Sequence, residues 1–184
     1  MIDSLIAKSL VIRQHGGTLS RFRLFETTAS YAEQRLADAG EAIPVRERHL
    51  DHYFGIAGRH PAAMWADLSA RDTLGADRAN VVAAFDWAAS QDRWKVAARL
   101  LLGAFAVFYA HRVEGIDLVG RCLEHLDNDD DLAVRLRSNE YWLHLLVLDM
   151  PAANAIVRSL RDAPTPVEQF QGYLFLGPWV SIRS

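Results

Sequence analysis

The chain has 184 residues, of which 51% are hydrophobic and 23% are charged. These proportions are typical of a folded globular protein and exclude an intrinsically disordered chain. The formal net charge of −3 argues against a basic nucleic-acid-binding module, which carries a marked excess of lysine and arginine. A chain of this length buries roughly 70% of its unfolded surface, so it needs no disulfide or metal to hold a core.

Cys122 is the only cysteine in the sequence, which excludes an internal disulfide and a cysteine-rich zinc site. A single thiol fits a reducing compartment. The N-terminus has an early acidic residue, Asp3, and lacks the basic start and apolar stretch of a signal peptide. The longest apolar run, residues 100–110, is about half as long as a membrane span requires. We therefore expect a soluble cytoplasmic protein without a membrane partner.

Two short β-prone runs, residues 10–13 and 21–25, flank a glycine-containing loop and predict a β-hairpin. Side chains alternate across a strand, so one face is expected to be apolar, formed by Leu10, Ile12, Phe22 and Leu24. The opposite face would carry three arginines, Arg13, Arg21 and Arg23. These arginines could contact a phosphate or a protein partner, or they could simply form a solvated face of the hairpin.

The sequence after the hairpin is helical, because apolar residues recur every three or four positions. This periodicity predicts helices over residues 27–39, 44–57, 76–90, 94–108, 116–126, 132–146 and 151–160, followed by an apolar segment over 170–180. Thr27 or Thr28 is the expected N-cap of the first of these helices, and Gly40 is its expected end.

The longer helices of successive pairs are expected to begin near Trp94, Asp131 and Val167, at intervals of 37 and 36 residues. A long helix followed by a short helix at this interval is typical of helical-hairpin arrays such as tetratricopeptide repeats. The fold class predicted is therefore mainly α, a tetratricopeptide-like array preceded by a short β-hairpin.

Asp127, Asp129 and Asp131 alternate as do the first ligands of a calcium loop. Such a loop continues with a glycine and ends with a glutamate, and Leu132 and Ser138 stand at those two positions. We therefore interpret the acidic stretch as a solvated loop that caps the next helix.

His49 and His52 lie about one helical turn apart, and a metal there would need a third ligand such as Glu47 or His60. No motif supports this, and we expect surface histidines and no metal site. Cys122 and His125 have the spacing of a nucleophilic pair on a helix, although packing and surface positions are the better interpretation. The sequence contains neither a G-x-x-x-x-G-K-[ST] phosphate loop nor a G-x-S-x-G elbow, so we predict no enzyme activity and no cofactor.

Several segments taken together resemble one protein family. They are residues 5–11, 21–32, 45–54, 80–88 and 114–115, which read LIAKSLV, RFRLFETTASYA, VRERHLDHYF, NVVAAFDWA and EG. In order and spacing they resemble the region that follows the nucleotide-binding domain in transcriptional regulators with a signal-transduction ATPase of the NB-ARC or STAND kind. Actinobacterial regulators of the LuxR and AfsR types have this organisation.

The resemblance implies the end of a winged-helix domain over residues 1–42, with the hairpin at about 10–25 as its wing. It implies a tetratricopeptide-like array over residues 43–184. In that family the array senses ligands or partner proteins, and the winged helix packs on the ATPase core. Related ATPases have a Met-His-Asp triplet that contacts the nucleotide after the hairpin, whereas Leu24-Phe25-Glu26 stands here. Phe25 cannot donate the corresponding hydrogen bond.

The sequence therefore predicts a non-catalytic regulatory or sensor segment of an ATPase-type transcriptional regulator. Its array would bind a protein partner or a small effector, and an ATPase domain of another chain is one candidate partner. The alternative is a structural module that self-associates into a homo-oligomer, because Leu5, Ile6, Leu10 and Ile12 would be poorly covered in an incomplete winged helix. A DNA-contacting remnant that acts through the hairpin arginines is a third, less favoured interpretation.

Overall fold

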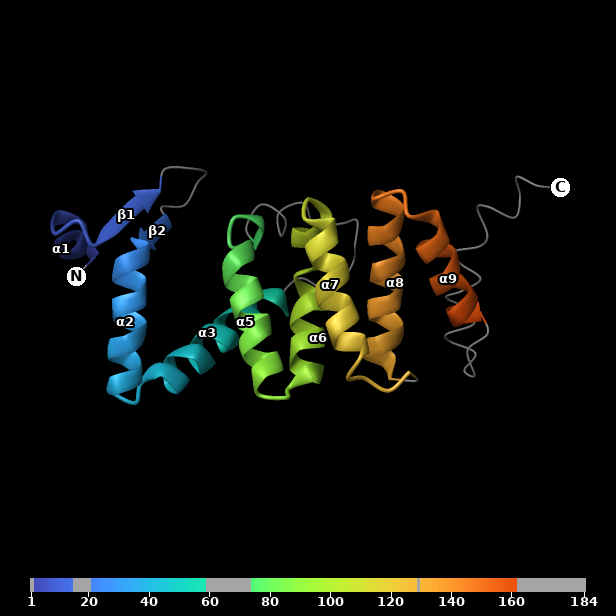
Figure 1. The fold of residues 1–184 in the computed structure, drawn as a ribbon, viewed down its shortest axis with the longest axis horizontal. Coiled ribbons are helices and arrows are strands. Elements are labelled where there is room, and N and C mark those ends of the chain that lie inside the picture. The colour runs from blue at the N-terminus through green and yellow to red at the C-terminus, as the bar shows by residue number, and fades with distance from the viewer. Residues whose placement is uncertain (1, 15–20, 59–73, 129, 162–184) are drawn as a thin grey trace. The chain divides into compact units, whose positions relative to one another are not determined.

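The computed structural model describes residues 2–14, 21–58, 74–128 and 130–161 (Figure 1). The described part is mainly helical with one small antiparallel sheet, as predicted. The elements in chain order are α1 (Ile2–Ala7), β1 (Val11–Gln14), β2 (Arg21–Leu24), α2 (Glu26–Asp38), α3 (Ala42–Ala57), α5 (Arg78–Ser90), α6 (Trp94–Gly103), the 3₁₀ helix η1 (Phe105–Tyr109), α7 (Arg112–Leu123), α8 (Asp131–Leu146) and α9 (Met150–Arg161). The chain forms two compact units, Met1–Arg48 (unit 1) and His49–Ser184 (unit 2).

Unit 1 has very little hydrophobic core of its own. Among its described residues Val11 is the one buried apolar side chain, and neither α1 nor α2 buries any residue. Several large apolar side chains of this unit are exposed instead, namely Ile2, Leu10, Ile12, Phe22, Leu24, Phe25, Tyr31 and Ile43. The helix α2 begins at Glu26 with Phe25 as its N-cap, which makes no side-chain capping bond. The predicted threonine cap is therefore wrong, because both threonines lie inside the helix.

Four of the helices that the structure describes end in the same way, with one residue in the left-handed conformation. These residues are Ser9, Gly40, Asp92 and Leu148, with φ of 55°, 71°, 55° and 62°. After each, the next backbone N–H reaches back to a carbonyl in the last turn, as in Asp149 N to His144 O at 2.9 Å. This is the Schellman arrangement, which satisfies carbonyls that have no partner within the helix. The predicted end of the first long helix at Gly40 is confirmed.

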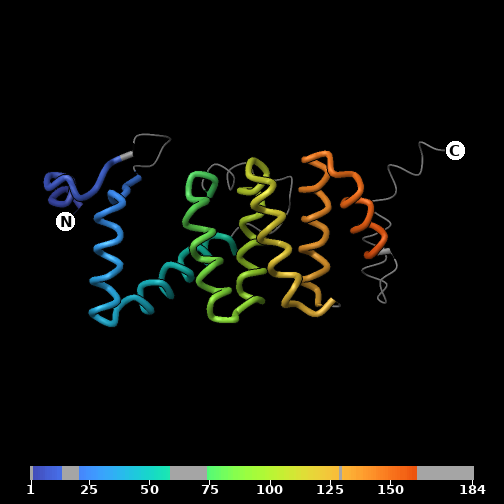
Figure 2. Tube along the Cα trace, in the orientation of Figure 1, coloured from blue at the N-terminus to red at the C-terminus, as the bar shows by residue number. Residues whose placement is uncertain are grey.

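The helices α5 to α9 of unit 2 run in alternating directions, and each packs on the next (Figure 2). In addition, α6 contacts α8, so the first helices of two successive hairpins touch one another. The predicted starts at Trp94 and Asp131 coincide with the first residues of α6 and α8, whereas Val167 lies outside the described residues. This arrangement is compatible with a tetratricopeptide-like array.

The apolar stripe predicted to form one helix over residues 94–108 is divided into two elements. The helix α6 ends at Gly103, and the chain continues as η1. A 3₁₀ helix has three residues per turn, so Phe105 and Phe108 lie on one side, and both are buried. The sequence does not reveal this change, because residues 100–110 are apolar on every face and have no period that could locate a break.

Small residues occupy many positions at which the helices of unit 2 meet. Side chains with no exposed surface include Ala84, Ala88, Ala97, Ala98, Ala104, Ala133 and Ala153. A Cβ atom on Gly115 of α7 would lie 2.8 Å from Phe108 Cβ and 3.0 Å from Leu143 Cδ1. Since such distances are shorter than normal contacts, α7 can approach η1 and α8 this closely because residue 115 has no side chain.

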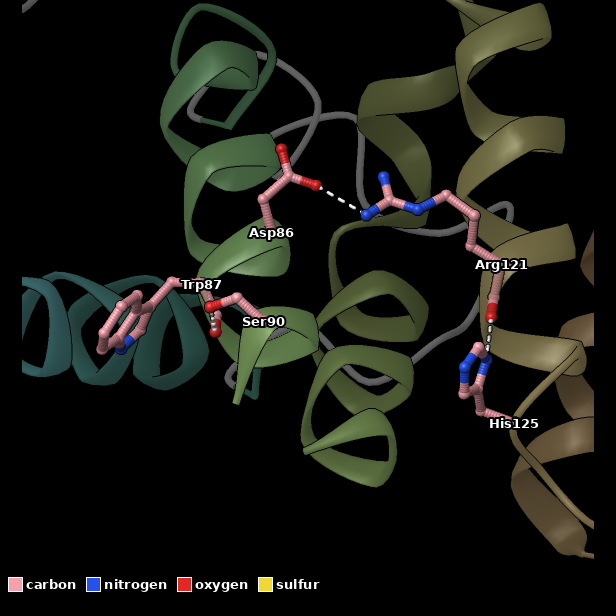
Figure 3. Close-up of polar contacts among 5 residues, drawn as sticks. All are labelled: Asp86, Trp87, Ser90, Arg121 and His125. Carbon is pink, nitrogen blue, oxygen red and sulfur yellow. Dashed lines mark hydrogen bonds and ion pairs between the residues drawn. The ribbon is translucent and has the colours of Figure 1, made fainter. Parts of the chain in front are cut away.

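A polar contact links α5 directly to α7 (Figure 3). Arg121 Nη2 donates to Asp86 Oδ1 at 2.9 Å, and the Arg121 guanidinium lies 4.9 Å from the centroid of the Phe85 ring. His125 Nδ1 lies 3.2 Å from the Arg121 carbonyl oxygen, one turn further along the chain. Both side chains of the Asp86–Arg121 pair are partly exposed, so it orients two helices that the core already holds and contributes about 1 kcal/mol or less.

In the part of the chain that the structure describes, no helix combines the length and apolar character needed to cross a membrane.

Two glycines of α7 provide a matched test of the close packing. We expect Gly115→Ala to lower the free energy of unfolding by about 1–3 kcal/mol, since its methyl group would overlap Phe108 and Leu143. Apart from the backbone of its own helix, no described atom lies within 4 Å of the Cβ position of Gly120. Gly120→Ala should therefore raise stability by about 0.5–1 kcal/mol through helix propensity alone. Urea denaturation of both variants checks this, and equal effects of the two substitutions would contradict the close packing at Gly115.

Candidate functional site

The hairpin arginines do not share one face of the sheet. The antiparallel register pairs Val11 with Leu24, Ile12 with Arg23, Arg13 with Phe22 and Gln14 with Arg21. Directly opposed residues point to the same side of a sheet, so Arg13 lies on the side of Phe22, with its guanidinium 5.5 Å from the ring centroid. Arg21 and Arg23 lie on the other side. The predicted division into an apolar face and an arginine face is therefore wrong. The observed pairing of the two strands is shifted by one residue from the pairing that this division requires.

The pair Cys122 and His125 cannot act as a nucleophile and its base. Cys122 is fully buried, and burial raises the pKa of its thiol to about 12. The group therefore stays protonated at neutral pH, whereas the reactive form of a cysteine is the thiolate. The His125 ring stacks instead on Trp94, with ring centroids 3.8 Å apart.

The two candidate metal ligands on α3 make ordinary packing contacts. The ring centroid of His49 lies 4.9 Å from that of Tyr53, and the ring centroid of His52 lies 5.0 Å from it. Burial lowers the pKa of His49, and this effect is partly offset by a hydrogen bond with the side chain of Asn80. No group of three or more metal-binding side chains occurs within the described ranges, and His60 lies outside them.

The acidic stretch caps α8, as predicted, and Asp130 is the capping residue. Its Oδ1 accepts a hydrogen bond from the Leu132 backbone N–H at 2.9 Å, and its Oδ2 lies 2.7 Å from Lys95 Nζ. The Lys95 hydrogen bond, followed by the backbone hydrogen bond, lowers the pKa of Asp130. The same contact with Asp130 raises the pKa of Lys95, so both groups are charged at neutral pH. Asp129 lies outside the described residues.

This ion pair lies at the edge of a groove of about 440 Å³ in unit 2. The groove is bounded by the end of α3, by α6 and by the first turns of α8, and its lining residues are Phe54, Ala57, Gly58, Lys95, Arg99, Leu102, Gly103, Asp130, Asp131, Leu132 and Arg135. Ala57, Leu102 and Leu132 are buried, whereas Lys95, Arg99, Asp131 and Arg135 are exposed. The groove thus has an apolar floor and a charged rim.

The close approach of α3 and α6 defines one wall of the groove. A Cβ atom on Gly103 would lie 2.5 Å from the Ala57 carbonyl oxygen and 2.9 Å from Ala57 Cβ, so only glycine fits there without a shift of the backbone. On α6, Lys95, Arg99 and Leu102 are spaced by four and three residues and therefore lie on one side of the helix.

Sequence reasoning did not identify this groove, although part of its signal was present. The spacing of Lys95, Arg99 and Leu102 indicates one mixed face of a helix, and this pattern is also typical of a solvated helix surface. The contributions of α3 and α8 come from segments far apart in the sequence, and only the folded chain brings them to α6.

A second hollow of unit 2 lies at the beginning of α7, where Arg78 Nη1 lies 2.6 Å from both carboxylate oxygens of Glu114. Its other lining residues include Arg112 and Val113 of α7 and Val147, which follows α8. Exposed polar side chains also line this hollow, His111 and Asp117 among them.

Comparison with known proteins gives a partial match. The chain is 33% identical over 125 residues to one protein of Mycobacterium bovis and two of Mycobacterium tuberculosis, each named "Putative HTH-type transcriptional regulator". The match covers 65% of this chain but only 14% of the length of each relative. No family model and no solved structure matches the chain.

Asp130 supplies a testable contribution to the stability of unit 2. Asp130→Ala should lower the free energy of unfolding at pH 7 by about 1 kcal/mol, because α8 loses its N-cap. Since the pKa of Asp130 is lowered on folding, the stabilisation is present above the ordinary aspartate pKa and is lost as the pH falls below it. The difference between wild type and variant should therefore shrink in urea denaturation at pH 3.

The neighbouring residue provides the control. Asp131 is exposed and lies 3.8 Å from Arg135, so Asp131→Ala should change stability by less than about 0.5 kcal/mol. A loss as large as that of Asp130→Ala would contradict the assignment of Asp130 as the cap.

Proposed function

We propose that this chain is a regulatory segment of a transcriptional regulator, and that its helical array binds an effector or protein partner without catalysing a reaction. The observation that carries the proposal is the groove of α3, α6 and α8, which combines a buried apolar floor with exposed rim charges. The similarity to part of three mycobacterial proteins named as HTH-type transcriptional regulators supports the regulatory context.

The mechanism follows from the way in which three segments form the groove. A ligand that contacts α3, α6 and α8 together binds best to one arrangement of these helices, so it stabilises that arrangement over others. The resemblance to NB-ARC and STAND regulators of the LuxR and AfsR types suggests an ATPase module as the recipient of the change. On this proposal the chain itself holds no nucleotide, because Phe25 replaces a residue that would contact phosphate.

A thermal-denaturation panel tests the proposal. The full chain is heated with Mg·ATP, ADP, amino acids, sugars and short-chain carboxylates, each at a high concentration. An effector at 100 times its Kd should stabilise the fold by about 2.7 kcal/mol and raise Tm by about 5–10 °C. The increase should be lost when Arg99 and Arg135 on the groove rim are both changed to glutamine.

The control is Arg112→Gln, since Arg112 lies at the second hollow, and this variant should respond as wild type. Hydrolysis of ATP, or tight magnesium-dependent ATP binding by the chain alone, would contradict the proposal. The proposal would also be contradicted if no compound of the panel raised the Tm of the wild type more than that of the variant with Arg99 and Arg135 changed to glutamine.

The exposed apolar side chains of unit 1 favour a second candidate, self-association into a homo-oligomer. Phe22, Leu24 and Phe25 are 39%, 39% and 44% exposed, and a second copy that covered them would bury apolar surface. Light scattering on the same samples separates the two candidates. A monomer that binds an effector favours the sensor, and an effector-independent dimer favours the structural module.

A further inference from the structure

The rim of the α3–α6–α8 groove carries more positive charge than its own ion pairs neutralise. Lys95 pairs with Asp130 at 2.7 Å, and Arg135 lies 3.8 Å from Asp131. Arg99, the remaining charged residue of the rim, forms no hydrogen bond or ion pair with any residue in the described ranges, and its charge helps to lower the pKa of nearby Asp130. The groove therefore has one excess positive charge, whereas the chain as a whole carries −3.

Of the two carboxylates of the rim, Asp130 is held by two donors, whereas Asp131 is 78% exposed and lies 3.8 Å from Arg135. Asp130 accepts hydrogen bonds from both Lys95 and the Leu132 backbone N–H, so a cationic ligand would have to compete with these donors. At Arg99 no hydrogen bond has to be broken before an anionic ligand binds, and its guanidinium offers five N–H donors in a planar fork. With three cationic and two anionic side chains, the rim as a whole favours an anion over a cation.

The floor of the groove adds an apolar requirement. Leu102 and Leu132 are 4% and 7% exposed, and Phe54 is half-buried beside them. A volume of about 440 Å³ lies within the range of small-molecule pockets, which are mostly apolar with a few placed polar groups. A ligand that fills this space carries an apolar body, and a small inorganic anion would leave the floor uncovered.

We propose that the groove binds a small amphiphilic anion, with its carboxylate at Arg99 and its apolar body on Phe54, Leu102 and Leu132. This assignment rests on the proposed function and adds to it the chemical class of the effector. Lys95 and Asp130 stay paired with each other, and Arg99 supplies the charge that the ligand neutralises.

Titration of the ¹⁵N-labelled full chain with sodium octanoate, octylammonium chloride and octanol tests the proposal, because these probes share one chain length and differ in charge. Octanoate should shift amide resonances of α6 and of the first turn of α8 in a saturable way. Octylammonium should bind at least about tenfold more weakly, since a charged hydrogen bond is replaced by repulsion. Octanol should lie between the two.

Arg99→Gln should weaken octanoate binding about tenfold and leave octanol binding unchanged, because the substitution removes the charge and leaves the floor intact. Arg112→Gln, outside the groove, should bind octanoate as wild type. Both arginines are exposed, so both variants are expected to fold, and their amide spectra test this directly.

Four outcomes would overturn the assignment: no octanoate binding, equal binding of octylammonium, unchanged octanoate binding by Arg99→Gln, or shifts confined to residues outside the groove. In each case the proposed sensor function stands if the thermal panel still finds an effector that depends on the groove rim. The sensor function fails together with this assignment only if the thermal panel also finds no effector that depends on the groove rim.

Discussion

The distance between neighbouring helices of unit 2 is set by residues with almost no side chain. Gly115 allows α7 to approach Phe108 and Leu143, and Gly103 allows α6 to approach Ala57 at the end of α3. Alanines such as Ala97 and Ala133 have no exposed surface. Because interiors are close-packed, one extra methyl group at such a contact displaces a helix. The spacing of the helices and the shape of the groove depend on these contacts.

The groove follows from this packing together with one helix cap. Gly103 fixes α6 against the end of α3, and Asp130 joins the start of α8 to α6 through Lys95. The charged residues needed to hold these elements are therefore paired with each other. Arg99 is not required for this purpose, and it remains available to a ligand at the rim. A regulatory function fits an array in which a ligand contacts three elements at once, since small differences in helix position then change its affinity.

The sequence predicts those features that depend on local pattern. The starts of α6 at Trp94 and α8 at Asp131 follow from apolar periodicity and an acidic cap, and the end of α2 follows from Gly40. Three features depend on information that a local pattern lacks. The register of the hairpin depends on the geometry of its loop, so the pairing of Arg13 with Phe22 could not be derived. The break after Gly103 lies in a uniformly apolar run, and the groove combines segments that are distant in sequence.

Hydrogen exchange of the full chain, measured peptide by peptide, tests the central claim that unit 2 is one packed array whereas unit 1 has little core of its own. The account predicts that amides of α5 to α8 exchange with one common, high protection, because they share a single buried cluster. Amides of α1, β1, β2 and α2 should exchange much faster. The claim would be contradicted if the amides of both units were equally protected. It would also be contradicted if the amides of α6 and those of α8 showed clearly different protection.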